Sequence, residues 1–310
     1  MLATAENLRE LYRNNRVQYM EGYHGGKPEW PRFAIEVPSS TKEQAYNWLA
    51  AFPGMKEFLG EMVVVKLGKH RYAIINRPWY DTVAIPQDDI EDDTYGVHAP
   101  RFKALGEVAA THPDELIAQL LIDAFDPVKG LDYTGSAFFA ENKEPIEKER
   151  KFSNMTTKKL SRDNFRAARQ SLRERTNPFG RSLNLGVKLV LVVTPADESL
   201  GKEILVADNI DKGNAGVTNV DKGDAELFVW NQLSAVSPAT WRPWFLLELG
   251  KSIKPLILQM RQRPDVYALD DMTADHVFKN HEFLYQAWAR YNAGFGLPEL
   301  AYGSKGTTAA

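Results

Sequence analysis

The sequence predicts an α+β protein, and three stretches carry that prediction. Residues 94–125 repeat apolar side chains at helical spacing behind an acidic block at 88–93. Residues 63–85 are rich in β-branched and aromatic residues, which is typical of a β-hairpin. Residues 187–193 form a continuous apolar run of the kind found in buried strands. Helices and strands are therefore both expected in large amounts.

The first forty residues predict an arm with scattered apolar anchors. Residues 4–21 carry a thin apolar stripe, and an isolated helix of this kind is marginal without a surface to rest on. The Gly-Gly-Lys-Pro sequence at 25–28 ends that helix. The anchors on the two sides of this break are Leu8, Leu11, Tyr12, Tyr19, Trp30, Phe33, Ile35 and Val37. The alternative is a peripheral helix packed on its own domain.

Residues 63–67, 71–75 and 80–85 predict a β-hairpin, preceded by a short helical stretch at 48–62. Asn76-Arg77-Pro78 is the expected turn between the last two segments. Two such strands are only marginally stable alone in water, so they must join a sheet or lie across a neighbour. We favour the second arrangement, with an ordinary sheet hairpin as the alternative.

The acidic block at 88–93 has five carboxylates in six positions. Calcium loops need ligands at alternate positions, a central glycine and a distant glutamate, and this spacing lacks them. Negative side chains at a helix start satisfy free N–H groups and the positive end of the helix dipole. We therefore interpret the block as the cap of the following helix, with a metal site as the alternative.

The long helix is expected to extend to about residue 125. Its apolar stripe consists of Phe102, Leu105, Val108, Ala109, Leu116, Leu120, Leu121 and Ala124. Pro113 lies inside it, where proline removes a hydrogen bond and clashes with the preceding turn. Thr111 and Asp114-Glu115 resemble a second helix start, so a kink or short break is expected there. A helix of this length reaches about 45 Å, so we expect it to support an extended part of the protein.

Downstream, two further helices and four strands are predicted. Ser161 is a helix N-cap before the apolar face of Phe165, Ala168 and Leu172. A further helix is expected at 198–205, and strands at 187–193, 227–230, 244–247 and 255–260. Apolar and aromatic character returns at 283–293, and residues 303–310 are expected to be a loose tail.

Length and composition exclude several classes of function. A chain of 310 residues suggests two domains plus appendages. There is no cysteine, which excludes disulfides and thiol chemistry. The net charge of −3 argues against a protein whose main task is to neutralise phosphate. No apolar run has the length of a membrane span, and no secretory signal pattern opens the chain.

No catalytic, cofactor-binding or metal-binding set is predicted. The Gly-Xaa-Ser-Xaa-Gly, phosphate-loop and dinucleotide motifs are all missing from the sequence. His276 and His281 lie five residues apart, which differs from the spacing of helical zinc ligands. Ser161 and Asp163 could join a histidine in a triad, but nothing in the sequence brings them together. A mixed chain without such a site is expected to act through its surfaces.

A series of short motifs resembles the major head subunit of Mu-like phages and prophages. The motifs are Asp-Thr-Val-Ala-Ile-Pro at 81–86, Glu-Asp-Asp at 91–93, Thr-His-Pro-Asp-Glu-Leu at 111–116, Phe-Phe at 138–139, Leu-Ser at 160–161, Leu-Val-Leu-Val-Val at 189–193, Trp-Phe-Leu at 244–246, Lys-Pro-Leu-Ile at 254–257, Arg-Tyr-Asn at 290–292 and Gly-Leu-Pro at 296–298. They occur in the family's order over nearly the whole chain. That order is more specific than any single motif.

The resemblance implies the Hong Kong 97-type capsid fold. In that fold an N-terminal arm, an extended β-hairpin called the E-loop, a spine helix and two domains called P and A follow one another. The implied division is an arm at 1–55, an E-loop at 56–90, a P-domain at 91–130 and 246–304 with the spine helix at 91–125, an A-domain at 131–245, and a flexible tail at 305–310.

The resemblance also implies the function of a major capsid protein, not an enzyme. Copies would form hexamers and pentamers of an icosahedral shell in the virion, assembled in the host cytoplasm around double-stranded DNA that the inner face contacts non-specifically. The implied partners are a scaffold, a maturation protease, a portal and a possible decoration protein, without a membrane. We expect the subunit contacts to include Lys69, His70, Arg71, Arg77, Trp79, Trp30 and Phe33.

Three alternatives remain open at this point. A non-viral encapsulating shell protein could share the fold. A metal enzyme could use the carboxylates at 88–93. A nucleic-acid-binding protein could use the helix at 158–175, which carries seven Lys/Arg against two acids, although a solvated helix face is the simpler interpretation.

Overall fold

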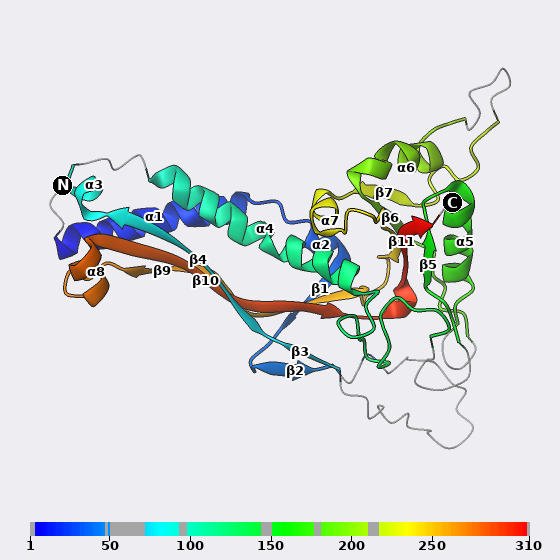
Figure 1. Ribbon diagram of the computed structural model, residues 1–310, viewed down its shortest axis with the longest axis horizontal. Helices are drawn as coiled ribbons and strands as arrows, with labels where there is room; N and C mark the ends of the chain where they lie inside the picture. The colour runs from blue at the N-terminus through cyan, green and yellow to red at the C-terminus, as the bar shows by residue number, and fades with distance from the viewer. Residues whose placement is uncertain are drawn as a thin grey trace.

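The protein consists of a long, narrow part and a compact part (Figure 1). The structure is a computed structural model that describes residues 4–46, 49, 72–92, 98–143, 151–176, 181–209 and 217–308. The long part holds the N-terminus, and the compact part holds the C-terminal strand. The prediction of a mixed α+β chain is confirmed.

The long part is a four-stranded sheet beneath two helices. The strands are, in spatial order, β1 (Ala34–Pro38), β9 (Leu256–Leu269), β10 (Glu282–Phe295) and β4 (Arg77–Pro86). β9 and β10 pair antiparallel, and their 14 residues each would span about 45 Å at ~3.3 Å per residue. The helices α1 (Ala5–Gly25) and α4 (Ala99–Asp123) run along this sheet, and α8 (Asp275–Asn280) lies at its far end (Figure 1).

The N-terminal segment packs on its own chain, so the prediction of an arm that needs another surface is wrong for these residues. Gly22 and Gly106 make the contact between α1 and α4 close. A Cβ on Gly106 would lie 2.1 Å from the Tyr19 carbonyl oxygen, and one on Gly22 would lie 2.0 Å from that of Lys103. The thin stripe of Leu8 and Leu11 is buried against the sheet. This is the alternative of a peripheral helix on its own domain.

The compact part is a five-stranded mixed sheet with short helices around it. The strands are, in spatial order, β5 (Met155–Lys158), β11 (Ala301–Thr308), β8 (Trp244–Glu248), β6 (Leu189–Val193) and β7 (Glu226–Val229). The helices are α5 (Arg162–Arg173), α6 (Glu198–Leu205) and α7 (Asn231–Val236), with 3-10 turns η2 (Pro195–Asp197) and η3 (Pro298–Leu300). Every residue of β6 and β8 is buried. The predicted helices at 161–172 and 198–205 and the strand at 187–193 are confirmed.

The expected loose tail is instead a strand in the middle of this sheet. β11 pairs with β8 on one side and with β5 on the other. Gly303 lies against the ring of Phe139, where a Cβ would come within 2.9 Å of the ring carbons. The predicted boundaries at 304 and 305 therefore cut through a strand, and of the expected tail only residues 309–310 lie outside the described residues.

One apolar core joins the two parts. The last turns of α4 contribute Ile117 and Leu121, the compact sheet contributes Phe245, and the long sheet contributes Leu258 and Tyr291. The short helix α2 (Trp30–Phe33) leads into β1 at the same place. The relative position of the two parts is thus fixed by a continuous hydrophobic contact.

The predicted hairpin divides between two sheets. β3 (Ala73–Ile75) pairs with β2 (Glu43–Ala45), whereas β4 pairs along ten positions with β10. Residues 77–86 therefore belong to the long sheet, which is the alternative of an ordinary sheet strand, and the chain passes between the strands at Asn76. The predicted helix at 48–62 and strand at 63–67 fall outside the described residues, apart from Leu49.

The acidic block does not cap the long helix, so that prediction is wrong. Asp88 and Asp89 lie in the first turn of a separate short helix, α3 (Gln87–Glu91). α4 begins at Ala99 with a proline in its first turn, and its N-cap His98 lies 3.4 Å from the Asp89 carboxylate. The helix also continues through Pro113 without the expected break.

Candidate assembly surfaces

The long sheet buries one face and leaves the other open. Along β10, Phe283, Tyr285, Ala287, Ala289 and Tyr291 alternate with half-buried residues, and they face the helices. Side chains of a strand alternate between the faces, so the intervening positions lie opposite the helices. The described residues place no helix over that second face (Figure 1). We call it the open sheet face and define it by Tyr80, Tyr267, Leu269, Leu284 and Trp288.

The open sheet face is apolar and accessible. Tyr80 is 70% exposed, and its ring lies 6.3 Å from that of Trp288, on the strand position paired with it. Leu269 is paired with Leu284. Tyr267 and Leu269 are both exposed as well. Contiguous apolar residues on a protein surface mark interaction sites more often than single ones do.

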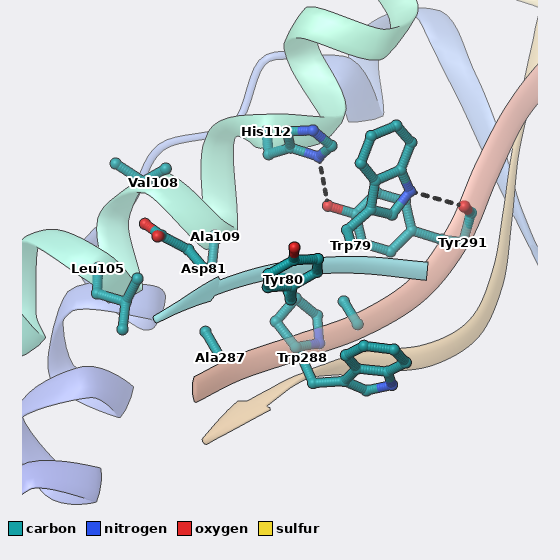
Figure 2. A pocket seen from close by; sticks show the side chains of 12 residues that line it. Trp79, Tyr80, Asp81, Leu105, Val108, Ala109, His112, Ala287, Trp288 and Tyr291 are labelled. Atoms are coloured by element: carbon teal, nitrogen blue, oxygen red, sulfur yellow. Dashed lines mark hydrogen bonds between the residues drawn. The ribbon is translucent and has the colours of Figure 1, made fainter. Parts of the chain in front are cut away.

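A groove lies on the helix side of the same strand (Figure 2). It encloses about 250 Å³ between α4 and the β4–β10 pair. Trp79 points toward α4, with its ring 4.6 Å from that of His112, and its indole N–H donates to the Tyr291 carbonyl at 3.0 Å. The rim includes Val108, which is 56% exposed.

The polar groups of the groove bind β4 and α4 to Tyr291 of β10. His112 Nδ1 and the Tyr291 hydroxyl are 2.7 Å apart. Burial lowers the pKa of His112 and raises the pKa of Tyr291, so both are neutral near pH 7. The groove is therefore lined by uncharged rings and aliphatic carbon, which suits contact with an apolar side chain.

A second apolar surface lies at the far tip of the long part. Phe278 of α8 is 75% exposed, and Met272 in the preceding turn is also exposed. His281 ends α8 in the left-handed conformation, with φ of 53°, and returns the chain into β10. The tip thus presents a large aromatic side chain far from the compact part.

The structure places the predicted contact residues in different settings. Arg77 is exposed at the start of the edge strand β4, and Trp79 is half-buried in the groove. Trp30 is half-buried at the start of α2, where its N–H donates to Asp114. Phe33 is fully buried in its own chain against Trp230, so it offers no surface in this conformation. The remaining three, Lys69, His70 and Arg71, lie outside the described residues.

Sequence reasoning missed the residues of the open sheet face and the tip. The signal for Tyr80 is present, because strict alternation along 77–86 puts it opposite Trp79. Its neighbour Trp288 comes from a strand some two hundred residues later, and the register that pairs them is not encoded locally. Phe278 lies between the predicted strand at 255–260 and the apolar segment at 283–293, where no element is predicted.

The basic helix favoured by the nucleic-acid alternative is largely neutralised. Arg162 and Arg166 of α5 both approach Asp221, at 3.3 and 2.8 Å, and Arg169 lies 2.6 Å from Asp224. Arg175 is buried and donates to backbone carbonyls, among them that of Ala301 at 3.1 Å. These contacts fit a structural role for the helix.

The described part of the chain offers neither a metal site nor a membrane-spanning helix. Within it, no three His, Cys, Asp or Glu side chains gather in a way that could hold a metal ion. None of its helices combines the length and apolar character that a membrane crossing requires.

Comparison with known proteins gives consistent matches along the chain. The family model of the Mu-like prophage major head subunit gpT matches residues 8–159, 152–233 and 230–310. The major capsid protein of Escherichia phage Mu is 27% identical over 306 residues, which cover 99% of this chain and 76% of that protein. The Mu-like prophage FluMu major head subunit of Haemophilus influenzae is 24% identical, with the same coverage. A chain of the procapsid of bacteriophage JBD30 superposes with a TM-score of 0.59 at 24% identity, covering 97% of this chain and 76% of that one.

Proposed function

Since the chain belongs to the Mu-like prophage major head subunit family and is a major capsid protein of the Hong Kong 97-type fold, we propose that its copies form the hexamers and pentamers of an icosahedral shell. As a capsid component it is part of the virion. We place its assembly in the host cytoplasm, around double-stranded DNA. A scaffold, a maturation protease, a portal and a possible decoration protein complete the proposed set of partners.

The observation that carries this proposal is the one-sided packing of the long part. The compact sheet buries both faces of its central strands. The long sheet exposes Tyr80 and Tyr267 on a face that the described strand β3 covers only at its other end, beside Asn292 and Gly294. A shell subunit needs broad contacts repeated around a ring. Heterologous contacts that close by rotation supply such rings.

We assign the long part, with β4, α4, β9 and β10, to the P-domain. The compact part, with β5 to β8 and β11, corresponds to the A-domain. The E-loop then lies between β2 and β3, which pair through Ala45 and Ala73. This moves its centre toward the N-terminus compared with the range of 56–90 expected from the sequence, because residues 77–86 are committed to the long sheet.

The open sheet face can be tested with a charge. Tyr80→Glu places a carboxylate on that face without touching the core, since the Tyr80 side chain is 70% exposed. We expect a soluble, folded subunit that forms no particles, seen by size-exclusion chromatography and negative-stain electron microscopy. Val128→Glu, at a site that is 76% exposed beyond the end of α4, is the matched control. Normal shells from Tyr80→Glu would refute the role of this face.

The E-loop assignment can be tested by a deletion that spares the sheet. The Tyr46 N–H donates to the Tyr72 carbonyl at 2.7 Å, so a short Gly-Ser linker can replace residues 51–70 between these ends. We expect the variant to keep the helical and sheet content of the subunit by circular dichroism and to lose shell formation. Full-sized shells from this variant would show that the segment is dispensable for assembly.

A further inference from the structure

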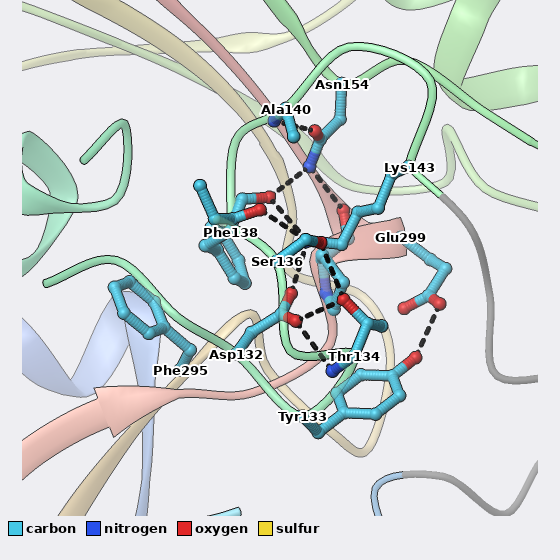
Figure 3. Close-up of polar contacts among 12 residues, drawn as sticks. Asp132, Tyr133, Thr134, Ser136, Phe138, Ala140, Lys143, Asn154, Phe295 and Glu299 are labelled. Atoms are coloured by element: carbon cyan, nitrogen blue, oxygen red, sulfur yellow. Dashed lines mark hydrogen bonds and ion pairs between the residues drawn. The ribbon is translucent and has the colours of Figure 1, made fainter. Parts of the chain in front are cut away.

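A lysine and an aspartate meet inside the protein, away from every surface described above (Figure 3). Asp132 and Lys143 lie on the loop that connects α4 to β5, and both side chains are fully buried. Lys143 Nζ is 2.5 Å from Asp132 Oδ2. The backbones are fixed as well, because Lys143 exchanges two hydrogen bonds with Phe152 and the Asp132 N–H donates to the Ser136 carbonyl.

The two oxygens of the Asp132 carboxyl group have different surroundings. Oδ1 accepts from the Thr134 N–H at 2.8 Å and from the Thr134 hydroxyl at 2.6 Å. Oδ2 faces the lysine and forms the ion pair with Nζ. Oδ1 is therefore held by two donors, as a carbonyl oxygen would be in an acyl-transfer site, while Oδ2 is directed at the amine.

The burial of the pair favours its uncharged form. Desolvation raises the pKa of Asp132 and lowers the pKa of Lys143, and their mutual attraction opposes both shifts. Glu299, fully buried nearby, also has a raised pKa because of burial, and it accepts a hydrogen bond from the Tyr133 hydroxyl at 2.7 Å. A carboxylic acid and a neutral amine are the two groups that form an amide by loss of water.

We propose that Lys143 and Asp132 condense to an amide within each subunit. The lone pair of Nζ attacks Cγ of the protonated carboxyl group, and the developing charge on Oδ1 is met by the two Thr134 donors. The Cγ–Oδ2 bond then breaks. Oδ2 leaves as water, carrying the acid proton and one proton from the amine. No oxidant or co-reactant is needed, and one water is released for each amide formed.

The hydrogen bonds around the pair suit the product. Nζ now donates to the Ala137 carbonyl at 2.6 Å, and the single N–H of an amide can keep that bond. The Phe138 carbonyl lies 3.3 Å from Nζ and also accepts from the Asn154 amide at 2.7 Å. It therefore keeps one hydrogen-bond donor when Nζ has only a single N–H left.

The amide would close the loop that carries two core aromatic residues. Phe138 and Phe139 lie between residues 132 and 143 and pack into the core shared by the two parts of the molecule. Asn154 joins the same loop to the C-terminal segment through the Pro298 carbonyl at 3.3 Å. A covalent closure here would hold the junction of the long and compact parts.

Mass spectrometry tests the proposal on the purified full-length chain and on assembled particles. We expect the denatured chain to be lighter than its sequence by one water, and a protease digest to contain a branched peptide joining Asp132 to Lys143. Lys143→Arg should restore the full sequence mass, whereas Lys129→Arg, at an exposed lysine of the same loop, should keep the loss.

Three results would overturn the proposal. The first is a wild-type chain with its full sequence mass in both samples, which needs no variant to fold. The second is a loss of water that persists in Lys143→Arg, because that loss would come from another site. The third is a branched peptide in which Lys143 is joined to any residue other than Asp132.

Discussion

The compact part and the long part of this subunit bury their strands differently. In the compact part β6 and β8 are buried at every position. In the long part β10 is buried at every second position, and the open sheet face holds exposed aromatic side chains. The central strands of the compact part are covered on both faces, whereas the long part exposes a face that we propose a second copy covers.

This difference separates stability from assembly. Side chains that fill the compact core determine whether the subunit folds, since burial of apolar area is the dominant favourable term. Exposed side chains on the open sheet face contribute little to the stability of the isolated subunit, and we expect their main effect to be on assembly. Substitutions in the two parts should therefore change different measurements.

The largest expected effect on the subunit comes from the compact core. Phe245 is fully buried among Phe125 and Phe139, so Phe245→Ala should lower the free energy of unfolding by about 3–5 kcal/mol. Tyr80→Ala, on the open sheet face, should change it by less than about 0.5 kcal/mol. Urea unfolding of the dispersed subunit measures both. Equal losses would break the distinction between the two parts.

The next effect concerns the contact of α1 with α4. Gly106→Ala places a methyl group 2.1 Å from the Tyr19 carbonyl oxygen, and the helices must separate. We expect a loss of about 3 kcal/mol, the upper end for overpacking, and faster hydrogen exchange along α1. Gly25→Ala is the matched control, because its Cβ meets nothing within 4 Å. Unchanged exchange in Gly106→Ala would show that α1 does not depend on this contact.

A third effect depends on pH and acts where α2 meets α4. The buried Asp114 carboxylate accepts from the backbone N–H of Glu29 and Trp30, and burial raises its pKa to about 6. The folded state therefore binds the proton more tightly than the unfolded state, in which an aspartate has a pKa near 4. Stability from this group is present below pH 4 and is lost as the pH rises to about 6.

Asp114→Asn removes that dependence while keeping an oxygen that can accept the same N–H groups. Relative to this variant, the wild type should lose about 2–3 kcal/mol between pH 4 and 6, since each unit of pKa shift corresponds to about 1.4 kcal/mol. Asp126→Asn is a control of opposite sign, since backbone donors lower the pKa of Asp126 and the wild type gains from rising pH. A flat difference between wild type and Asp114→Asn would contradict the shift.

The sequence predicted the elements whose local pattern decides their structure. Residues 189–193 are apolar throughout because both faces of β6 are covered, and Ser161 caps α5 by accepting from the Asn164 N–H at 3.3 Å. The family resemblance then supplied the fold, since many short motifs occur in its order. Local pattern and motif order are both readable from one chain.

The rest was decided by contacts distant in sequence. The stripe of Leu8 and Leu11 shows that α1 needs a surface, but the stripe does not say which copy supplies it. Residues 303–308 have few apolar side chains, and they form a strand because backbone pairing with β8 and β5 holds them. Tyr80 and Trp288 become one surface only through the β4–β10 register. That register follows from the folded sheet as a whole.

The smallest effect measures what holds α1 on the long part besides its apolar stripe. Arg16 of α1 makes a bidentate pair with Asp265 of β9, at 3.0 and 2.9 Å, with both side chains more than a third exposed. Asp265→Asn should cost about 0.5 kcal/mol, and less at high salt, because an exposed pair is screened and restricts two side chains. Glu198→Gln, which breaks the local pair with Lys202 in the compact part, should cost no more. A loss well above 1 kcal/mol for Asp265→Asn alone would mean that the packing of α1 depends on this ion pair. The long part would then be stabilised by charge to an extent that the compact part, which is stabilised by apolar burial, is not.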